Sequence, residues 1–227
     1  MMKKKIAILV YCLCLFVITA VRKPLMRAFA IMNDQNLKGM IIVIDAGHGG
    51  NDPGARISGQ DEDEINLDLA LKLKSILERA GANVEMTRTD DVDLSDAGAE
   101  HIKRSDMEHR AEILNHEDVT LFVSLHCNTS ADQRCTGSQV YYRKEDEVSR
   151  KLADTIQDHL RVVTSSKYIP ASGDFYLLNM TNTLGVLIET GFMTNPADLS
   201  KLQDEKYRED LAYAIYKGIS EFLSVLV

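Results

Sequence analysis

The hydrophobic positions of this chain fall into two alternating patterns: short uninterrupted apolar runs and longer stretches with helical spacing. Residues 40–44 are a continuous run of large, mostly β-branched side chains, typical of a strand buried on both faces of a parallel sheet. Between 69 and 80 the apolar residues recur at helical spacing, and Gly81 follows as a helix stop. The apolar segment 84–87 comes next, so these patterns predict a strand–helix–strand unit.

The same alternation continues toward the C-terminal end. Further helices are predicted at 104–115, 148–160 and 207–226, and further strands at 120–125, 139–142 and 185–188. Strands that alternate with helices are typical of helices covering both faces of a mainly parallel sheet. We therefore predict an α/β fold of three layers (αβα), with a mostly parallel, twisted sheet in a single domain at residues 40–227.

The N-terminal segment follows a different pattern. Three lysines at 3–5 precede residues 6–21, which contain no charged side chain, as in the basic and apolar regions of an export signal. As a helix this apolar stretch spans roughly 24 Å, less than the roughly 30 Å hydrocarbon core of a bilayer. We predict that residues 1–27 are a cleaved signal peptide or an uncleaved membrane anchor, that 28–39 are a linker, and that the domain is exported.

Charge separates the same two parts of the chain. Residues 1–27 hold six bases and no acid, whereas the rest holds 20 bases and 34 acids, a net charge of −14. Nucleic acids and anionic lipids are bound through basic patches. We therefore expect no nucleic-acid partner, and membrane contact only through the N-terminal segment. A content of 45% hydrophobic and 26% charged residues excludes a disordered protein.

Cysteine usage excludes a disulfide-stapled fold. Of the four cysteines, only Cys127 and Cys135 lie in the body of the chain, too few for a disulfide framework. One short bridge between them and two free thiols are both open alternatives.

Polar side chains follow three of the predicted strands. His48 stands in a Gly-His-Gly-Gly loop after the first strand, and His126 and Glu189 follow two later ones. In open α/β sheets, ligands bind beyond the carboxyl ends of the strands, so these side chains are candidates for one site. Hydrolytic zinc centres use three protein ligands and keep a position open for water, and the two histidines are candidates for two of them.

The third ligand is expected from the acidic run 61–64, just before the first predicted helix. Acids at a helix N-terminus also stabilise the helix without any metal, and spacing alone leaves Glu62 and Glu64 open. Cys127 is excluded as a ligand, because successive side chains of a strand point to opposite faces and His126 precedes it. The remaining histidines lie in charged, helix-like segments and are expected outside the site: His101, His109, His116 and His159.

Glu189 differs from the acids at 61–64 because it ends a fully apolar strand. An unpaired charge in such surroundings is energetically costly, so this carboxylate needs a partner. A carboxylate poised for proton transfer would be a natural general base beside a metal-activated water.

Four motifs, in order and correctly spaced, resemble the zinc-dependent N-acetylmuramoyl-L-alanine amidases of the type 3 family. They are Val43–Ala55, Glu62–Leu67, Ser124–Asn128 and Ile188–Pro196. The resemblance covers nearly all of residues 40–227 and implies hydrolysis of the amide between N-acetylmuramic acid and the first L-alanine of the peptidoglycan stem peptide.

The resemblance also implies the roles of the site residues. It makes His48, Glu62 and His126 the ligands of a Zn²⁺ cofactor, and Glu189 the catalytic acid and base. Glu62 is preferred over Glu64 because the family motif places its ligand four residues before the asparagine that matches Asn66. Two positions depart from the family pattern without touching the chemistry: Ala46 stands where proline is usual, and Thr190 where leucine is common.

The pattern around residues 103–112, on a domain with only residues 143–146 between a strand and the next helix, resembles the spore-cortex amidases of endospore-forming bacteria. This subtype implies removal of stem peptides before muramic lactam forms, at the cell wall or in the forespore intermembrane space. Targeting would then depend on the N-terminal segment or on an activating or tethering protein partner. Two alternatives stay open: a zinc carboxypeptidase or other cell-wall peptide hydrolase, and a non-catalytic exported wall-binding module.

Overall fold

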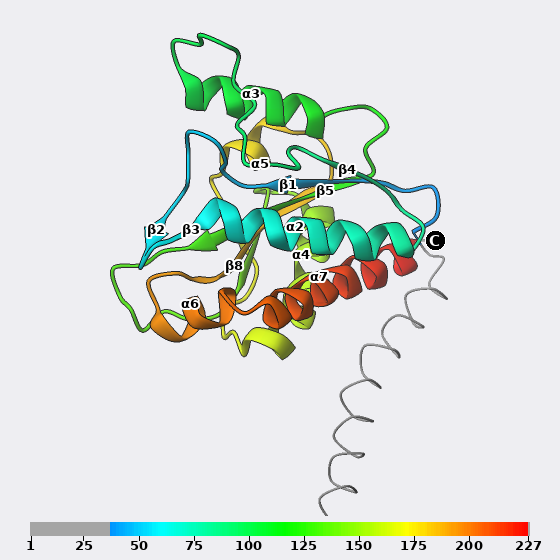
Figure 1. Cartoon of the computed structure of the whole chain (residues 1–227). Helices are drawn as coiled ribbons and strands as arrows, with labels where there is room; N and C mark the ends of the chain where they lie inside the picture. The colour runs from blue at the N-terminus through cyan, green and yellow to red at the C-terminus, as the bar shows by residue number, and fades with distance from the viewer. Residues whose placement is uncertain (1–36, 227) are drawn as a thin grey trace, which may run out of the picture. The chain divides into compact units, whose positions relative to one another are not determined.

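The computed structural model describes residues 37–226 (Figure 1). The predicted signal or anchor segment at 1–27, and the linker at 28–39 up to residue 36, lie outside the described residues. The strands are β1 (Ile41–Ala46), β2 (Arg56–Ile57), β3 (Gln60–Asp61), β4 (Asn83–Met86), β5 (Leu121–Asn128), β6 (Gln139–Tyr142), β7 (Ala171–Ser172) and β8 (Gly185–Phe192). The helices are α2 (Glu62–Arg79), α3 (Ile102–Leu114), α4 (Glu147–Thr164), α5 (Tyr176–Met180), α6 (Pro196–Leu202) and α7 (Glu205–Leu226).

The main sheet has the strand order β4-β1-β5-β8-β6-β7. Strands β4, β1, β5 and β8 pair in parallel, β6 pairs antiparallel with β8, and β7 pairs parallel with β6. Helices α2, α4 and α7 lie on one side of this sheet, and α3 and α5 lie on the other (Figure 1). The predicted three-layer α/β fold with a mostly parallel sheet is therefore confirmed.

Each strand and helix expected from the hydrophobic pattern is present, but several extend further than expected. Strands β5 and β8 continue past their apolar runs because their backbones remain paired through polar residues: His126 is opposite Glu189, and Asn128 is opposite Phe192. Helix α2 begins at Glu62, before its apolar spacing becomes visible. The β2–β3 hairpin, β7, α5 and α6 were not predicted, because they are too short for a periodic pattern.

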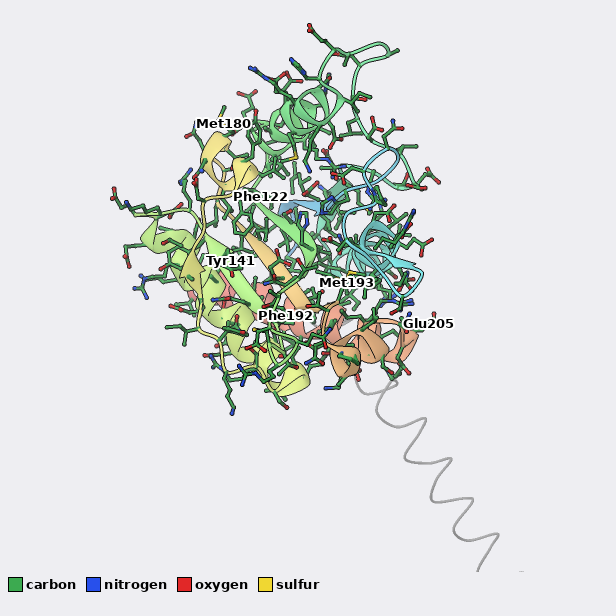
Figure 2. All side chains as sticks on the ribbon, turned by 90° about the vertical axis from the view of Figure 1, so that its left-hand side faces the viewer. Phe122, Tyr141, Met180, Phe192, Met193 and Glu205 are labelled. Atoms are coloured by element: carbon green, nitrogen blue, oxygen red, sulfur yellow. The ribbon has the colours of Figure 1, made fainter. Side chains whose placement is uncertain are left out.

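The core fills both sides of the sheet. On the α3 and α5 side, Phe122 of β5 (Figure 2) packs with Val43 and Leu187 of the neighbouring strands and with Leu114 of α3. Leu37 is also fully buried, so the packed domain already includes a residue before the predicted start at 40.

Among the described residues, no helix has both the length and the apolar character needed to cross a membrane.

Candidate metal centre

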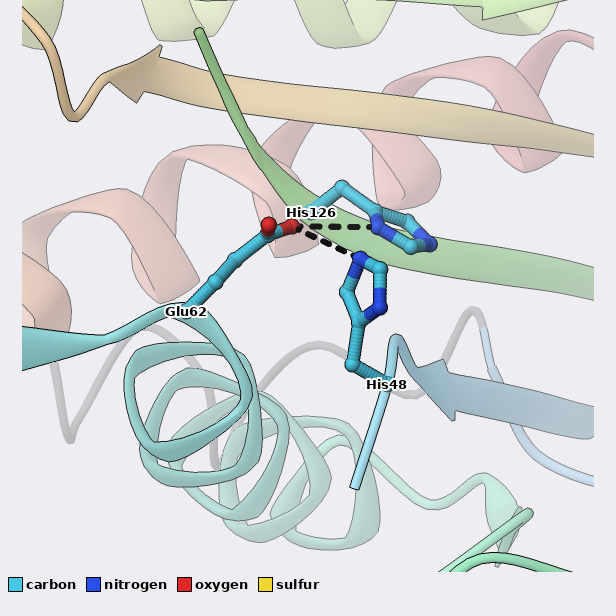
Figure 3. Close-up of side chains that lie close together, drawn as sticks. All are labelled: His48, Glu62 and His126. Atoms are coloured by element: carbon cyan, nitrogen blue, oxygen red, sulfur yellow. Dashed lines mark hydrogen bonds and ion pairs between the residues drawn. The ribbon is translucent and has the colours of Figure 1, made fainter. Parts of the chain in front are cut away.

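Three of the predicted site residues come together at the carboxyl edge of the sheet. Glu62 Oε1 lies 3.2 Å from His48 Nε2 and 3.2 Å from His126 Nδ1 (Figure 3). The ligand atoms of the three residues all lie within 4.8 Å of one another. Within residues 37–226 this is the one such grouping of histidine, cysteine and acidic side chains. Two imidazole nitrogens and a carboxylate oxygen form a donor set known in hydrolytic zinc centres.

Glycines make room for these candidate ligands. A Cβ atom on Gly47 would lie 2.3 Å from Cε1 of the His126 ring, and one on Gly54 would lie 2.7 Å from Oε2 of Glu62. Real Cβ atoms do not approach other atoms so closely, so both positions depend on the missing side chain. The glycine-rich loop after β1 therefore allows its backbone to lie directly against Glu62 and the His126 ring.

We predict that Gly47→Ala lowers zinc affinity by roughly 10–100-fold, the range seen when groups that orient metal ligands are lost. The added methyl group must displace the His126 ring, and Gly47 has no left-handed backbone strain that would complicate the change. Chelator competition measures the affinity. Gly191→Ala is the matched control, because its Cβ would meet its nearest atom at an ordinary 3.4 Å; equal affinities for both variants would contradict the prediction.

Glu62 is held in place by two backbone N–H groups. Its Oε1 accepts a hydrogen bond from the backbone N–H of Cys127 (3.0 Å), and its Oε2 accepts one from that of Ala55 (3.0 Å). Burial favours the protonated form, but the contacts with His126 and His48 outweigh it and hold the pKa of Glu62 far below its ordinary value. Spacing left Glu62 and Glu64 open; Glu62 is 4% exposed and lies in the cluster, whereas Glu64 is exposed.

His48 is oriented by a second carboxylate. Its Nδ1 lies 3.1 Å from Asp52 Oδ2, which also contacts Lys103 Nζ at 3.1 Å. Burial disfavours the charged imidazolium, but Glu62 and Asp52 outweigh it and raise the pKa of His48. A carboxylate on the far nitrogen of a metal-binding histidine fixes its tautomer and ring orientation. Asp52 therefore leaves Nε2 of His48 free to bind a metal.

Glu189 lies on β8, the strand next to β5, and is directly opposite His126 of the cluster. Its Oε2 is buried and has no hydrogen-bond partner among the described residues. Burial raises the pKa of Glu189 to about 7; His126 and His48 oppose this shift, and Glu62 adds to it. A carboxyl group with this pKa can both accept and donate a proton near neutral pH.

Cys127 points away from the cluster, as the alternation along the strand predicted. Its Sγ lies 3.6 Å from Asn66 Oδ1 and 3.4 Å from Thr190 Oγ1, on the α2 side of the sheet. Cys127 and Cys135 are both free thiols. Of the two alternatives left open by the sequence, one bridge or two free thiols, the structure has the free thiols.

The remaining histidines take no part in the candidate metal-binding group: His101, His109, His116 and His159.

Two buried arginines support the loop that carries His48, and the sequence did not identify either. Arg88 donates to the carbonyls of Ala46 (2.9 Å) and Gly47 (3.1 Å) and to that of Asp63 (2.8 Å), beside Glu62. It therefore ties the His48 loop to the start of α2. Arg88 directly follows the predicted strand 84–87. The rule that functional residues follow the carboxyl ends of strands, which indicated the histidines, therefore also applies to Arg88.

Arg110 holds the same loop and shares the Ala46 carbonyl with Arg88. Its guanidinium donates to the His48 carbonyl (2.7 Å), to Asp45 Oδ1 (2.8 Å) and to Asp106 Oδ2 (2.9 Å). Asp45 is fully buried. Burial alone would raise its pKa, but Arg110 opposes this, and with His126 it holds the pKa of Asp45 below its usual range.

We predict that Arg110→Met lowers the free energy of unfolding by about 3–5 kcal/mol, because it leaves the Asp45 carboxylate buried without its charge partner. Urea denaturation in the presence of a chelator measures this without a contribution from metal binding. In the control Arg104→Met, an exposed ion pair with Glu108 is lost, and the expected change is below about 1 kcal/mol. Similar losses in the two variants would contradict the assignment.

A cavity of about 160 Å³ borders the cluster on the α3 and α5 side. His48 and His126 form part of its wall, together with charged side chains such as Arg110 and apolar ones that include Met107 of α3 and Leu177 of α5. A substrate group in this cavity would therefore lie directly beside the two candidate imidazole ligands.

The three-layer fold and the His–Glu–His cluster beside a buried carboxyl group define the class of protein: a hydrolytic enzyme of α/β architecture with a centre suited to a metal ion. The family model for N-acetylmuramoyl-L-alanine amidase matches residues 42–221. The chain belongs to this family, and the resemblance seen in the four sequence motifs is confirmed. It is thus an enzyme that hydrolyses the amide between N-acetylmuramic acid and L-alanine.

Individual relatives agree with the family. The chain is 34% identical over 193 residues to the germination-specific N-acetylmuramoyl-L-alanine amidase of Bacillus subtilis (strain 168), covering 83% of this chain and 81% of that protein. The CwlD amidase of Clostridioides difficile, solved in complex with the GerS lipoprotein, is 36% identical with a TM-score of 0.79, over 82% of this chain and 99% of that one. An N-acetylmuramoyl-L-alanine amidase from Clostridium difficile 630 is 29% identical with a TM-score of 0.73, over 82% and 98%.

Proposed function

We propose that the domain beginning near residue 40 is a zinc-dependent amidase in which His48, Glu62 and His126 hold Zn²⁺ and Glu189 is the catalytic acid and base. The observation that carries this proposal is the convergence of three metal-binding atoms within 4.8 Å beside a buried carboxyl oxygen without a partner. The donor set fits zinc, because two neutral imidazoles and one carboxylate are among its usual ligands.

Each residue has a part in the proposed reaction. Bound Zn²⁺ would polarise the scissile carbonyl and lower the pKa of a water molecule to about 7. Asp52 accepts the Nδ1 proton of His48 and keeps its Nε2 unprotonated. Glu189 takes the proton of the attacking water and delivers it to the leaving nitrogen. The products are the free lactyl carboxylic acid and a stem peptide with an N-terminal alanine.

We place this activity in the spore cortex, where it would release stem peptides before muramic lactam forms. The support is the germination-specific relative at 34% identity and the similarity to the CwlD amidase. The CwlD structure contains a lipoprotein, which supports a tethering or activating protein partner for this chain as well. Export through residues 1–27 would bring the enzyme to this wall.

Dye release from purified peptidoglycan tests the metal-dependent activity. We expect the full-length chain to release dye, a chelator to abolish the release, and added Zn²⁺ to restore it. Release that is insensitive to the chelator would contradict the proposed metal centre. For the cellular role, a deletion strain should form a cortex without muramic lactam; a cortex with normal lactam would contradict the spore assignment.

A further inference from the structure

An open apolar groove runs along the surface between α3 and α5. It has a volume of about 690 Å³ and is lined by His101, Ile102, Lys103, Arg104, Met107 and Tyr176. Ile102 and Tyr176 are 45% and 38% exposed, although both are large apolar side chains. Met180, at the other end of α5 (Figure 2), is also exposed, at 54%. We call this surface the α3–α5 groove.

The α3–α5 groove is continuous with the metal centre. Lys103, Met107 and Tyr176 line both the groove and the smaller cavity whose wall includes His48 and His126. A polymer lying along the groove can therefore present one of its units to the metal centre without crossing another element of the fold.

The charge of the groove indicates which half of the substrate it suits, the glycan or the stem peptide. Its two permanently charged residues each face an acid: Lys103 Nζ lies 3.1 Å from Asp52, and Arg104 Nε lies 2.8 Å from Glu108. The remaining lining is mostly apolar. A stem peptide presents free carboxylates that need unpaired cations, whereas N-acetylated sugars are uncharged and pack their apolar faces on side chains such as Tyr176. The groove therefore suits the glycan better than the peptide.

The position of Glu189 also indicates how the glycan and peptide halves of the substrate lie across the site. The strand order β1-β5-β8 places the His48 loop, His126 and Glu189 side by side across the sheet edge. Because Glu189 protonates the leaving nitrogen, the peptide half of the substrate lies on the β8 side. The acyl half then extends toward the His48 loop and the α3 end of the groove, where Lys103 contacts Asp52 of that loop; α5, which carries Tyr176, packs on β8.

We propose that the α3–α5 groove is a binding subsite for the uncharged glycan strand on either side of the muramic acid residue whose amide is cleaved. This assignment rests on the amidase function proposed above. On this assignment, contacts with Ile102 and Tyr176 make the enzyme prefer long glycan strands to short fragments.

The test compares two substrates of different length. Ile102→Ala, Tyr176→Ala and the double variant are assayed on long solubilised peptidoglycan strands and on a disaccharide carrying one stem peptide. We expect kcat/KM on the strands to fall about tenfold more than on the disaccharide, mainly through KM, because the lost contacts bind the ground state and the transition state alike. Val148→Ala is the matched control: Val148 is a 49% exposed residue in the first turn of α4, on the other side of the sheet.

A binding measurement separates this proposal from the proposed function. In a Glu189→Gln background, the double variant should bind glycan strands whose lactyl carboxyl groups are capped as simple amides, and which are therefore uncharged, about tenfold more weakly than the parent, and free stem peptide should not compete. Equal losses on both substrates, unchanged glycan binding, or loss only of stimulation by a protein partner would overturn the subsite. If the wild-type chain cleaves neither substrate, the proposed function fails, and the binding measurement still decides the subsite.

Discussion

Replacing Glu189 with glutamine is expected to lower kcat by roughly 10²–10⁴-fold, the usual contribution of a positioned general acid and base. Glutamine has nearly the same shape but can neither accept the proton of water nor deliver one to the leaving nitrogen. Since Glu189 lies outside the group of metal-binding atoms, the variant should retain its full zinc content. Dye release and elemental analysis on the same preparation measure both quantities.

The matched control for this variant is Glu85→Gln, which changes an exposed glutamate on strand β4. It should keep kcat within about twofold of the wild type, as expected for a surface substitution away from the site. Full activity in Glu189→Gln would remove Glu189 from the mechanism. A joint loss of activity and zinc would make it a ligand instead.

Replacing His126 with alanine is expected to release the metal. The change removes one of the three proposed protein ligands, so zinc affinity should fall by more than the roughly 10–100-fold typical for loss of an outer partner. Activity should fall with zinc content, and excess Zn²⁺ should restore part of it. Elemental analysis after dialysis measures the metal, and circular dichroism checks that the domain remains folded.

The control here is His116→Ala. The His116 side chain is 66% exposed and lies beside Asp118, outside the metal-binding group. It should leave both zinc content and turnover at the wild-type level. Undiminished zinc in His126→Ala would exclude His126 as a ligand, and equal losses in both variants would mean that zinc is held elsewhere.

The edge of the sheet where the site lies could be predicted from the sequence, because buried parallel strands have an unmistakable apolar pattern. The pattern also located His48, His126 and Glu189 at the strand ends. It could not show that His126 and Glu189 lie directly opposite each other, since the pairing of distant strands depends on tertiary packing. The resemblance supplied the roles that spacing alone left open.

The hydrophobic pattern could not decide between Glu62 and Glu64 as the third candidate ligand. Both acids precede the apolar spacing of α2, so the first turn of the helix is invisible in the hydrophobic pattern. In the structure α2 starts at Glu62, and two backbone N–H groups hold its carboxylate inside the cluster. Those donors, from Ala55 and Cys127, are far apart in the chain, and no local pattern reports them.

Supporting residues were the least predictable. Arg88 follows a predicted strand and could have been singled out there, but Arg110 lies in a polar helical segment, where an arginine is ordinarily a solvated surface residue. Their burial follows from the carbonyl groups that the loop after β1 turns toward them. The α3–α5 groove likewise depends on α5, a helix of five residues that is too short to show a hydrophobic period.

The masses of the peptides released from purified peptidoglycan test the central claim most directly. A zinc amidase acting at the muramoyl bond should release intact stem peptides with a free N-terminal alanine, and it should leave the glycan strands whole. The same digest with a chelator should contain none of these peptides. Trimmed peptides would show a peptide hydrolase in place of the amidase, and stems left intact on the glycan would show that the muramoyl bond is not cleaved; either result would contradict the account.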